Sequence, residues 1–188
     1  MTKENQEKYS DVQLKILKIK DELENYTKKS SFVKDLFLKK HIFVQDIKSL
    51  LYVKVDEVLN SFSSIKDEDN KKKMCLIMIH MMIMLLVLKE KDIKTISDIE
   101  DIESFNILVN ERLYQLVDHV IEKNRKYGNS ALNPIRVMST LNTVEQLYIR
   151  LDDKLNRLMN RQDDEDEDIP FDIAGYFILI YIYYLTNK

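Results

Sequence analysis

A donor-rich loop in the last third of the chain carries residue types that suit phosphate binding. The segment from Asn124 to Arg136 reads NRKYGNSALNPIR and contains cations, amides, a hydroxyl and an aromatic ring. Cations and neutral donors bind phosphate oxygens, and an aromatic ring can stack on a nucleobase. The composition fits an ordinary connection between two helices equally well. The loop residues predicted to bind a nucleotide are Lys126, Tyr127, Asn129, Ser130 and Arg136.

A second polar motif, RLDDKLNRL, begins at Arg150. Residues four apart share a helix face, so Asp153 lies on one face with Arg157, and Arg150 lies on one face with Lys154. One interpretation is a salt-bridged surface. The other is functional, because Asp152 and Asp153 border the apolar stripe of this helix.

A third motif combines Asp168 and Asp172 with Gly175 and Tyr176, at the start of the most apolar helix. Asp172 is either an acid favoured by the helix dipole or a carboxylate that faces a cation on a neighbouring helix. Gly175 costs about 1 kcal/mol relative to Ala in a helix interior, which indicates close packing or close approach of a ligand.

Helices must position these motifs. The chain has 188 residues with only two Gly and two Pro, too few for the turns of a sheet-rich fold. Apolar spacing follows the helical period throughout, so we expect an all-α helical bundle of five to seven helices and no sheet. The expected helices are Asp11–Tyr26, Phe32–Phe62, Met74–Leu88, one from Ser97 to about Lys123, one from Thr143 to about Leu158, and Phe171–Leu185.

Local start and stop signals define the later helices. Ser97 with Glu100 and Thr143 with Gln146 fit capping boxes. Pro170 suits a first helical turn. We divide the chain into residues 1–95, a helical region of unassigned role, and residues 96–188, with both regions packed as one unit. The acidic run Asp163 to Asp168 fits a solvated linker better than a cation site.

Overall composition narrows the function classes. A net charge of −3 and a pI of about 5.7 argue against binding nucleic acid over the whole surface. The single cysteine, Cys75, excludes a disulfide within the chain and favours a reducing compartment. The first nine residues lack the apolar segment of a signal peptide. We therefore expect a cytoplasmic protein.

One apolar run, Met74 to Leu88, needs separate attention. At 15 residues it is shorter than the roughly 17 to 25 that span a bilayer, so we expect a buried helix and no membrane contact. Its methionines suit irregular packing or an oligomer interface. His80 fits a core histidine better than a metal ligand, because the other two histidines, His41 and His119, lie far from it in the sequence.

The three motifs together resemble a family. KYGNSALNPIRV, RLDDKLNRL and DIAGYFILIYI, in this order, are similar to small phage and bacterial proteins known as nucleotide-modification-associated or MazG-like helical domains. The resemblance covers about Leu116 to Leu185. It implies an all-α enzyme that hydrolyses nucleoside triphosphates to monophosphate and pyrophosphate, and it also implies dimers or tetramers.

The resemblance also implies site residues. Acid pairs on two consecutive helices hold Mg²⁺ in such enzymes, which would assign Asp152 and Asp153 to the first pair and Asp168 and Asp172 to the second. The usual Glu-x-x-Glu of that family is absent from RLDDKLNRL, and Glu-x-x-Asp is absent from the last helix. Asp153 and Asp172 would be catalytic, and the cations that neutralise phosphate would be Arg136, Arg150, Lys154 and Arg157.

Three functions follow as hypotheses. The first is a MazG-like nucleotide-binding protein, with Mg²⁺-dependent pyrophosphohydrolase activity as its catalytic form. The second is a non-catalytic relative that binds or sequesters a nucleotide in phage–host conflict. The third is a helical interaction protein that binds a protein partner. A homo-oligomer is expected, packed through Met74–Leu88 or Phe177–Leu185.

The acids allow a sharper expectation. If the last two helices are antiparallel, Asp153 and Asp172 should face each other, with Asp152 and Asp168 nearby. Two close carboxylates repel unless a cation lies between them. Either a divalent metal or a cationic side chain such as Lys154 or Arg157 can supply that charge.

Overall fold

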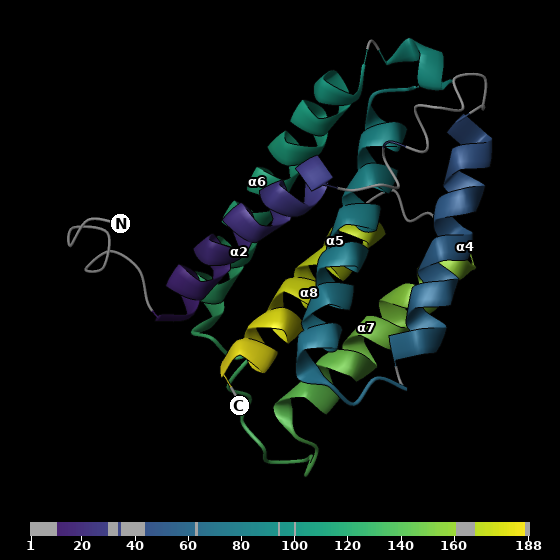
Figure 1. Cartoon of the computed structure of the whole chain (residues 1–188). Helices are drawn as coiled ribbons and strands as arrows, with labels where there is room; N and C mark the ends of the chain where they lie inside the picture. Colours follow the sequence, from purple (N-terminus) through teal and green to yellow (C-terminus); the bar gives the residue numbers. More distant parts are fainter. Residues whose placement is uncertain are drawn as a thin grey trace, which may run out of the picture.

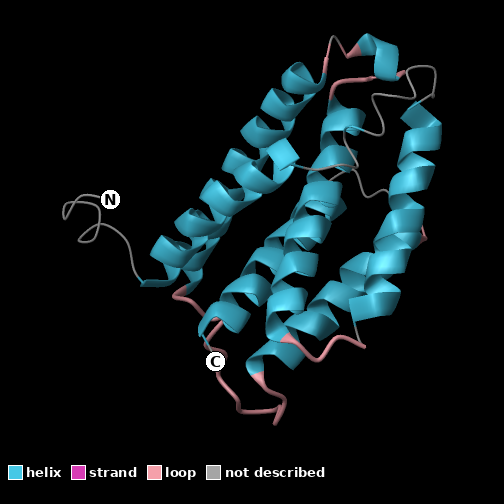
Figure 2. Cartoon of the chain, in the orientation of Figure 1, coloured by secondary structure: helices cyan, strands magenta, loops and turns pink. Residues whose placement is uncertain are grey.

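A computed structural model describes residues 11–29, 34, 44–62, 64–93, 95–99, 101–160 and 168–186 of the chain. Within these ranges the chain forms six α-helices and one short 3-10 helix, and no strand (Figure 2). The predicted all-α fold is thereby confirmed. The elements are α2 (Asp11–Lys29), α4 (Val44–Phe62), α5 (Glu68–Glu90), η1 (Ile96–Asp98), α6 (Ile102–Tyr127), α7 (Thr143–Met159) and α8 (Ile169–Thr186). The first part of the expected helix Phe32–Phe62 lies outside the described residues, apart from residue 34.

Helices α5 and α8 form the centre of the bundle. They pack along each other. Helices α2 and α6 pack together on one side of them, whereas α4 packs on α5 and α7 packs on α8 on the other side (Figure 1). The two regions that we divided at residue 95 therefore interleave, because α2 packs on α6 and α5 packs on α8. One continuous apolar core joins helices from both regions.

The methionine-rich run lies inside this core. Every residue from Met78 to Leu88 is buried, as expected for a helix that is apolar around its whole circumference. Other helices of the same chain cover Met78 to Leu88, which belongs to one of the two segments expected at an oligomer interface; the homo-oligomer stays a prediction. Burial also raises the pKa of the Cys75 thiol.

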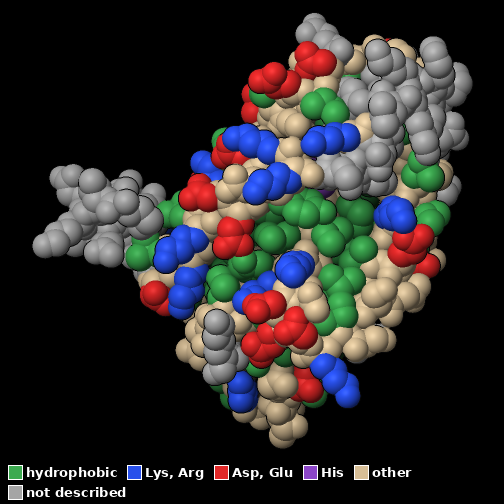
Figure 3. Space-filling view, in the orientation of Figure 1, with side chains coloured by type: hydrophobic (Ala, Val, Ile, Leu, Met, Phe, Trp, Pro, Cys, Tyr) green, Lys and Arg blue, Asp and Glu red, His purple; other side chains and the backbone are tan. Residues whose placement is uncertain are grey.

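Among the described helices, α8 alone is long and apolar enough to cross a membrane by length and composition. Half of that segment is buried against the rest of the chain, chiefly α5 and α7. The central helix of a helical bundle can have the same length and apolar composition as a membrane-spanning helix. Figure 3 shows apolar side chains along the middle of one face, where α5 and α8 lie in Figure 1, with charged side chains on either side.

Both predicted capping boxes are wrong in position. Helix α6 begins at Ile102, where the Asp101 side chain accepts a hydrogen bond from the Ser104 amide at 2.7 Å. Ser97 lies before it in η1, a turn that Asp98 closes by accepting from the Thr95 amide at 2.6 Å. Ser97, which the sequence pattern assigned to the helix start, therefore belongs to this tight turn.

The start of α7 differs from the prediction by one residue. Asn142 and Glu145 form the reciprocal capping box, while Thr143 is buried in the first turn. Asn is as good an N-cap as Thr, and Glu at the third position completes the box.

The end of α6 also lies later than expected. The helix continues to Tyr127 and ends at Gly128, whose φ of +59° is left-handed.

Candidate functional site

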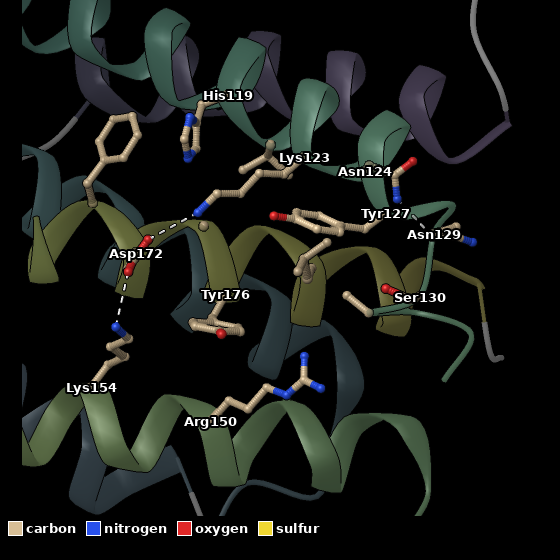
Figure 4. Close-up of a pocket in the computed structure, with 15 residues that line it drawn as sticks. His119, Lys123, Asn124, Tyr127, Asn129, Ser130, Arg150, Lys154, Asp172 and Tyr176 are labelled. Atoms are coloured by element: carbon tan, nitrogen blue, oxygen red, sulfur yellow. Dashed lines mark hydrogen bonds and ion pairs between the residues drawn. The ribbon is translucent and has the colours of Figure 1, made fainter. Parts of the chain in front are cut away.

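A cavity of about 400 Å³ lies between α6, α7 and α8, and we call it the α6–α7–α8 pocket (Figure 4). Its walls combine apolar side chains with cations, two tyrosines and one carboxylate. The lining residues are His119, Val120, Lys123, Asn124, Tyr127, Asn129, Ser130, Ala131, Arg150, Lys154, Phe171, Asp172, Gly175, Tyr176 and Leu179.

Packing of α8 between α6 and α7 brings these residues together. Along α8, Asp172 meets Lys154 of α7, and Tyr184 further on hydrogen-bonds Tyr148, which is earlier in α7. Against α6 the direction is the opposite, because α8 runs parallel to it: Phe171 and Asp172 lie beside His119 and Lys123, and Tyr176 lies further along in the direction of Tyr127 (Figure 4). The predicted antiparallel arrangement of the last two helices is confirmed.

Asp172 lies between two lysines from different helices. One carboxylate oxygen is 3.2 Å from Lys154 Nζ and the other is 3.5 Å from Lys123 Nζ. The Lys154 side chain is 13% exposed and that of Asp172 is 23% exposed, so this pair is partly shielded from water. Such shielding strengthens the attraction relative to a fully exposed surface pair. Of the two arrangements expected for Asp172, the structure contains the ion pair.

Two tyrosines and a histidine form the aromatic part of the pocket. Tyr127 is 58% exposed at the rim, and Tyr176 is half-buried on α8. Burial raises the pKa of Tyr176, which the nearby Arg150 guanidinium partly opposes. His119 contacts Phe171 edge-on, with ring centroids 5.3 Å apart. Burial and then Lys123 lower the pKa of His119, which favours its neutral form near pH 7.

The loop after α6 closes one end of the pocket. Gly128 and Asn129 both have positive φ angles, and the Asn129 amide donates to the Asn124 carbonyl at 3.2 Å. The Asn124 side chain also donates to Asn129 Oδ1 at 2.9 Å. These bonds terminate the helix and fix the direction in which the loop leaves it. Asn129 therefore has a structural role at the pocket edge.

The structure brings some predicted site residues together and separates others. The predicted residues in the pocket lining are Tyr127, Asn129, Ser130, Arg150, Lys154 and Asp172. Three predicted cations are outside the lining. The ammonium of Lys126 lies 5.5 Å from the Tyr127 ring centroid, Arg136 donates to the Thr143 hydroxyl at 3.4 Å, and Arg157 follows Lys154 along α7.

The four predicted metal-binding acids are not assembled into one site. Asp152 lines a separate groove with Phe62 and Lys71. Asp153 is exposed on α7, and its charge contributes to the raised pKa of Tyr176. Asp168 precedes α8, and partial burial together with the charge of Glu90 raises its pKa. Within the described ranges no three His, Cys, Asp or Glu side chains group together as possible metal ligands.

Sequence reasoning missed His119, Lys123 and Asn124 as pocket residues. A usable signal was present, because His119, Lys123 and Tyr127 are four apart and share one face of α6. The expected helix ended near Lys123, which put Tyr127 in a loop and hid this polar face. The left-handed Gly128 marks the true end of the helix.

No protein-family model matches this chain, and neither a curated protein nor a solved structure matches it significantly.

The pocket itself therefore provides the functional evidence. It has cations on two helices, aromatic rings on two helices and a neutral polar rim on the loop. A small anionic ligand with an aromatic or apolar part is the chemical class that suits such a lining.

Proposed function

We propose that the chain is a nucleotide-binding protein and that its ligand occupies the α6–α7–α8 pocket. The observation that carries this proposal is the convergence of Lys123, Arg150 and Lys154 from two helices around one cavity, beside two tyrosine rings. A pocket of about 400 Å³ lies within the range of roughly 300–1,000 Å³ typical of small-molecule sites.

The cations provide the phosphate-binding part of the proposed site. Lys123 and Lys154 lie on opposite sides of Asp172, and Arg150 is one turn before Lys154 on the same face of α7. Ammonium groups act as point charges toward phosphate oxygens, whereas the guanidinium can donate two parallel hydrogen bonds. A phosphate group in the cavity would meet cations from both helices.

The tyrosines provide the part that binds the base. Tyr127 is largely exposed at the rim, so its ring has a free face for stacking. Tyr176 lies deeper, next to Arg150. Stacking of a base on an aromatic side chain contributes about 1–3 kcal/mol and tolerates any base. Asn124 and Ser130 add neutral donors and acceptors at the rim.

The resemblance to MazG-like domains supports a nucleotide as the ligand and adds Mg²⁺-dependent hydrolysis as a hypothesis. The predicted set Asp152, Asp153, Asp168 and Asp172 does not fit one metal site as these residues are arranged, since no three of them group together. The geometry favours binding over hydrolysis. Hydrolysis and Mg²⁺ dependence stay predictions, which a nucleotide-binding screen with and without Mg²⁺ tests.

The interaction hypothesis has one supporting observation. Ile135, Val137 and Met138 in the loop before α7 are 88%, 75% and 97% exposed. Adjacent exposed apolar side chains are typical of surfaces that a partner covers. A protein partner or a second copy of the chain stays a prediction, and light scattering with and without nucleotide is its direct test.

A binding screen tests the proposed function. Thermal shifts and calorimetry with nucleotides of each base, with and without Mg²⁺, should show saturable stabilisation. Lys154→Met should weaken binding at least tenfold, because it removes the most shielded cation of the lining. Lys126→Met is the matched control, since that lysine lies outside the lining, and it should change affinity less than twofold.

Each outcome of the screen separates the hypotheses. Stabilisation with pyrophosphate release in Mg²⁺ supports the hydrolase, whereas stabilisation without turnover supports the binder. If no nucleotide of any base stabilises the protein, the proposal is wrong and the interaction hypothesis gains support.

A further inference from the structure

The charges of the pocket lining allow a sharper statement about the ligand, one that rests on the proposed function. Among the residues that the structure describes, the lining contains Lys123, Arg150 and Lys154 as cations and Asp172 as its only carboxylate, so these side chains carry a net charge of +2 with His119 neutral. The Lys154 side chain is 13% exposed, and a charge that is shielded from water is stabilised when an opposite charge matches it. The lining therefore favours a ligand group with about two negative charges.

A phosphomonoester carries such a charge. Its second pKa is about 6, so it bears roughly 1.5 to 2 negative charges at pH 7. A nucleoside triphosphate carries further negative charges that this lining does not match. A bound divalent cation could neutralise them, but Mg²⁺ in nucleotide sites is normally held by one or two protein carboxylates. Both oxygens of the one carboxylate in the lining face lysine ammonium groups, at 3.2 and 3.5 Å.

Position strengthens the argument from charge. Asp172 lies between Lys123 of α6 and Lys154 of α7, so a phosphate chain that extended from one of these lysines to the other would meet its carboxylate (Figure 4). A second or third phosphate placed there would meet the carboxylate at short range, which is repulsive. The volume of about 400 Å³ is also near the lower end of the roughly 300–1,000 Å³ range and suits a compact ligand.

We infer that the α6–α7–α8 pocket selects a nucleoside monophosphate, bound as the phosphate dianion without a bridging metal ion, and that Asp172 is the residue that disfavours longer phosphate chains. In this arrangement Lys154, Lys123 and Arg150 bind the phosphate. Tyr127 and Tyr176 contact the nucleoside.

Calorimetry on the full chain tests this inference. The probes are the mono-, di- and triphosphate and the 3′,5′-cyclic monophosphate of one nucleoside that binds, each measured in EDTA. The monophosphate should bind at least tenfold more tightly than the triphosphate. It should also bind more tightly than the cyclic compound, which carries one negative charge fewer. A triphosphate that binds as tightly or more tightly in EDTA, or a triphosphate that does so only with Mg²⁺, overturns the inference.

A substitution identifies the residue responsible. Asp172→Asn keeps the shape of the side chain and raises the net charge of the lining to +3. Affinity for the triphosphate should then rise more than affinity for the monophosphate, which reduces the preference at least fivefold. Asp152→Asn is the matched control, because Asp152 lines the separate groove and its loss should leave the preference unchanged. An unchanged preference in Asp172→Asn contradicts the role of that residue.

The two proposals fail in distinguishable ways. If the triphosphate is preferred, the pocket still binds nucleotides and only the inference about ligand charge is wrong. If none of the nucleotides binds, both proposals are wrong. The wild-type comparison decides the ligand class by itself, so the test stands even if Asp172→Asn does not fold.

Discussion

The core and the α6–α7–α8 pocket each contain a histidine, and the two histidines lie in opposite surroundings. His80 lies in the middle of α5 and is 2% exposed. Its Nδ1 is 3.3 Å from the Thr27 hydroxyl, which itself donates to the Leu23 carbonyl, while Nε2 has no partner among the described residues. His119 lies at the wall of the α6–α7–α8 pocket, next to Lys123 and Asp172.

The difference lies in what surrounds each polar group. Around His80 the neighbours are apolar side chains of the core and the edge of the Tyr26 ring, so a charge there has no compensation. Around His119, opposite charges lie close together and water has access. A change of charge should therefore alter folding stability in the first region and ligand binding in the second.

The largest expected effect comes from the core side of this comparison. Phe177 on α8 is 1% exposed, so Phe177→Ala should lower the free energy of unfolding by about 3–5 kcal/mol in urea denaturation. Tyr127→Ala removes an aromatic ring that is 58% exposed, and it should change stability by less than about 0.5 kcal/mol while weakening nucleotide binding. Equal losses of stability would show that Tyr127 belongs to the core.

Acid should destabilise the protein through His80. Burial lowers the pKa of His80 to about 4, from 6.5 in a model peptide. Between these values the unfolded chain binds a proton that the folded chain does not, so stability falls as the pH drops from about 6.5 to about 4. The loss amounts to roughly 3 kcal/mol at most.

Comparison of variants isolates the contribution of His80 from that of other titrating groups. His80→Leu should remove this part of the pH dependence in denaturation curves measured from pH 7 to pH 4. His119→Gln should leave it in place, since His119 is exposed. An unchanged slope in His80→Leu would mean that His80 is already protonated or hydrated in the folded state.

The two glycines offer a matched pair with opposite signs. Gly128→Ala should cost about 1 kcal/mol, because its φ is +59° and a side chain is strained there although nothing lies within 4 Å. Gly175→Ala should stabilise α8 by up to about 1 kcal/mol, because its new Cβ makes an ordinary contact of 3.6 Å with Val120. Thermal denaturation measures both. A destabilised Gly175→Ala would show that α6 and α8 are packed too tightly there for a methyl group.

Arg136→Ala should have the smallest effect. The sequence placed Arg136 at the ligand, but its guanidinium donates to the Thr143 hydroxyl at 3.4 Å, outside the pocket lining. Loss of this long hydrogen bond should cost less than about 1 kcal/mol, with nucleotide affinity within twofold of the wild type. A larger loss of affinity in calorimetry would show that Arg136 contacts the ligand.

Local features of the sequence predicted the helical fold and part of the site. Few turn residues and a steady helical period indicate helices, because both signals depend on residues close together in the chain. The apolar run around His80 predicts burial for the same reason. Helix ends were less predictable, since Ser97, Asp101, Asn142 and Thr143 all have side chains that can cap a helix. Which of them does so depends on where tertiary packing stops the helix.

By itself, then, the sequence determined the fold class, the buried position of the methionine-rich helix and the presence of cations and a tyrosine near the end of α6. Only the tertiary structure decided which charges meet. Helical spacing shows which residues share a face, but not which faces of different helices come together. Packing of α8 antiparallel to α7 and parallel to α6 placed Asp172 between Lys123 and Lys154, while Asp152 lies in a separate groove. Helix direction and rotation within the bundle are set by the whole core, and no segment of the sequence contains that information alone.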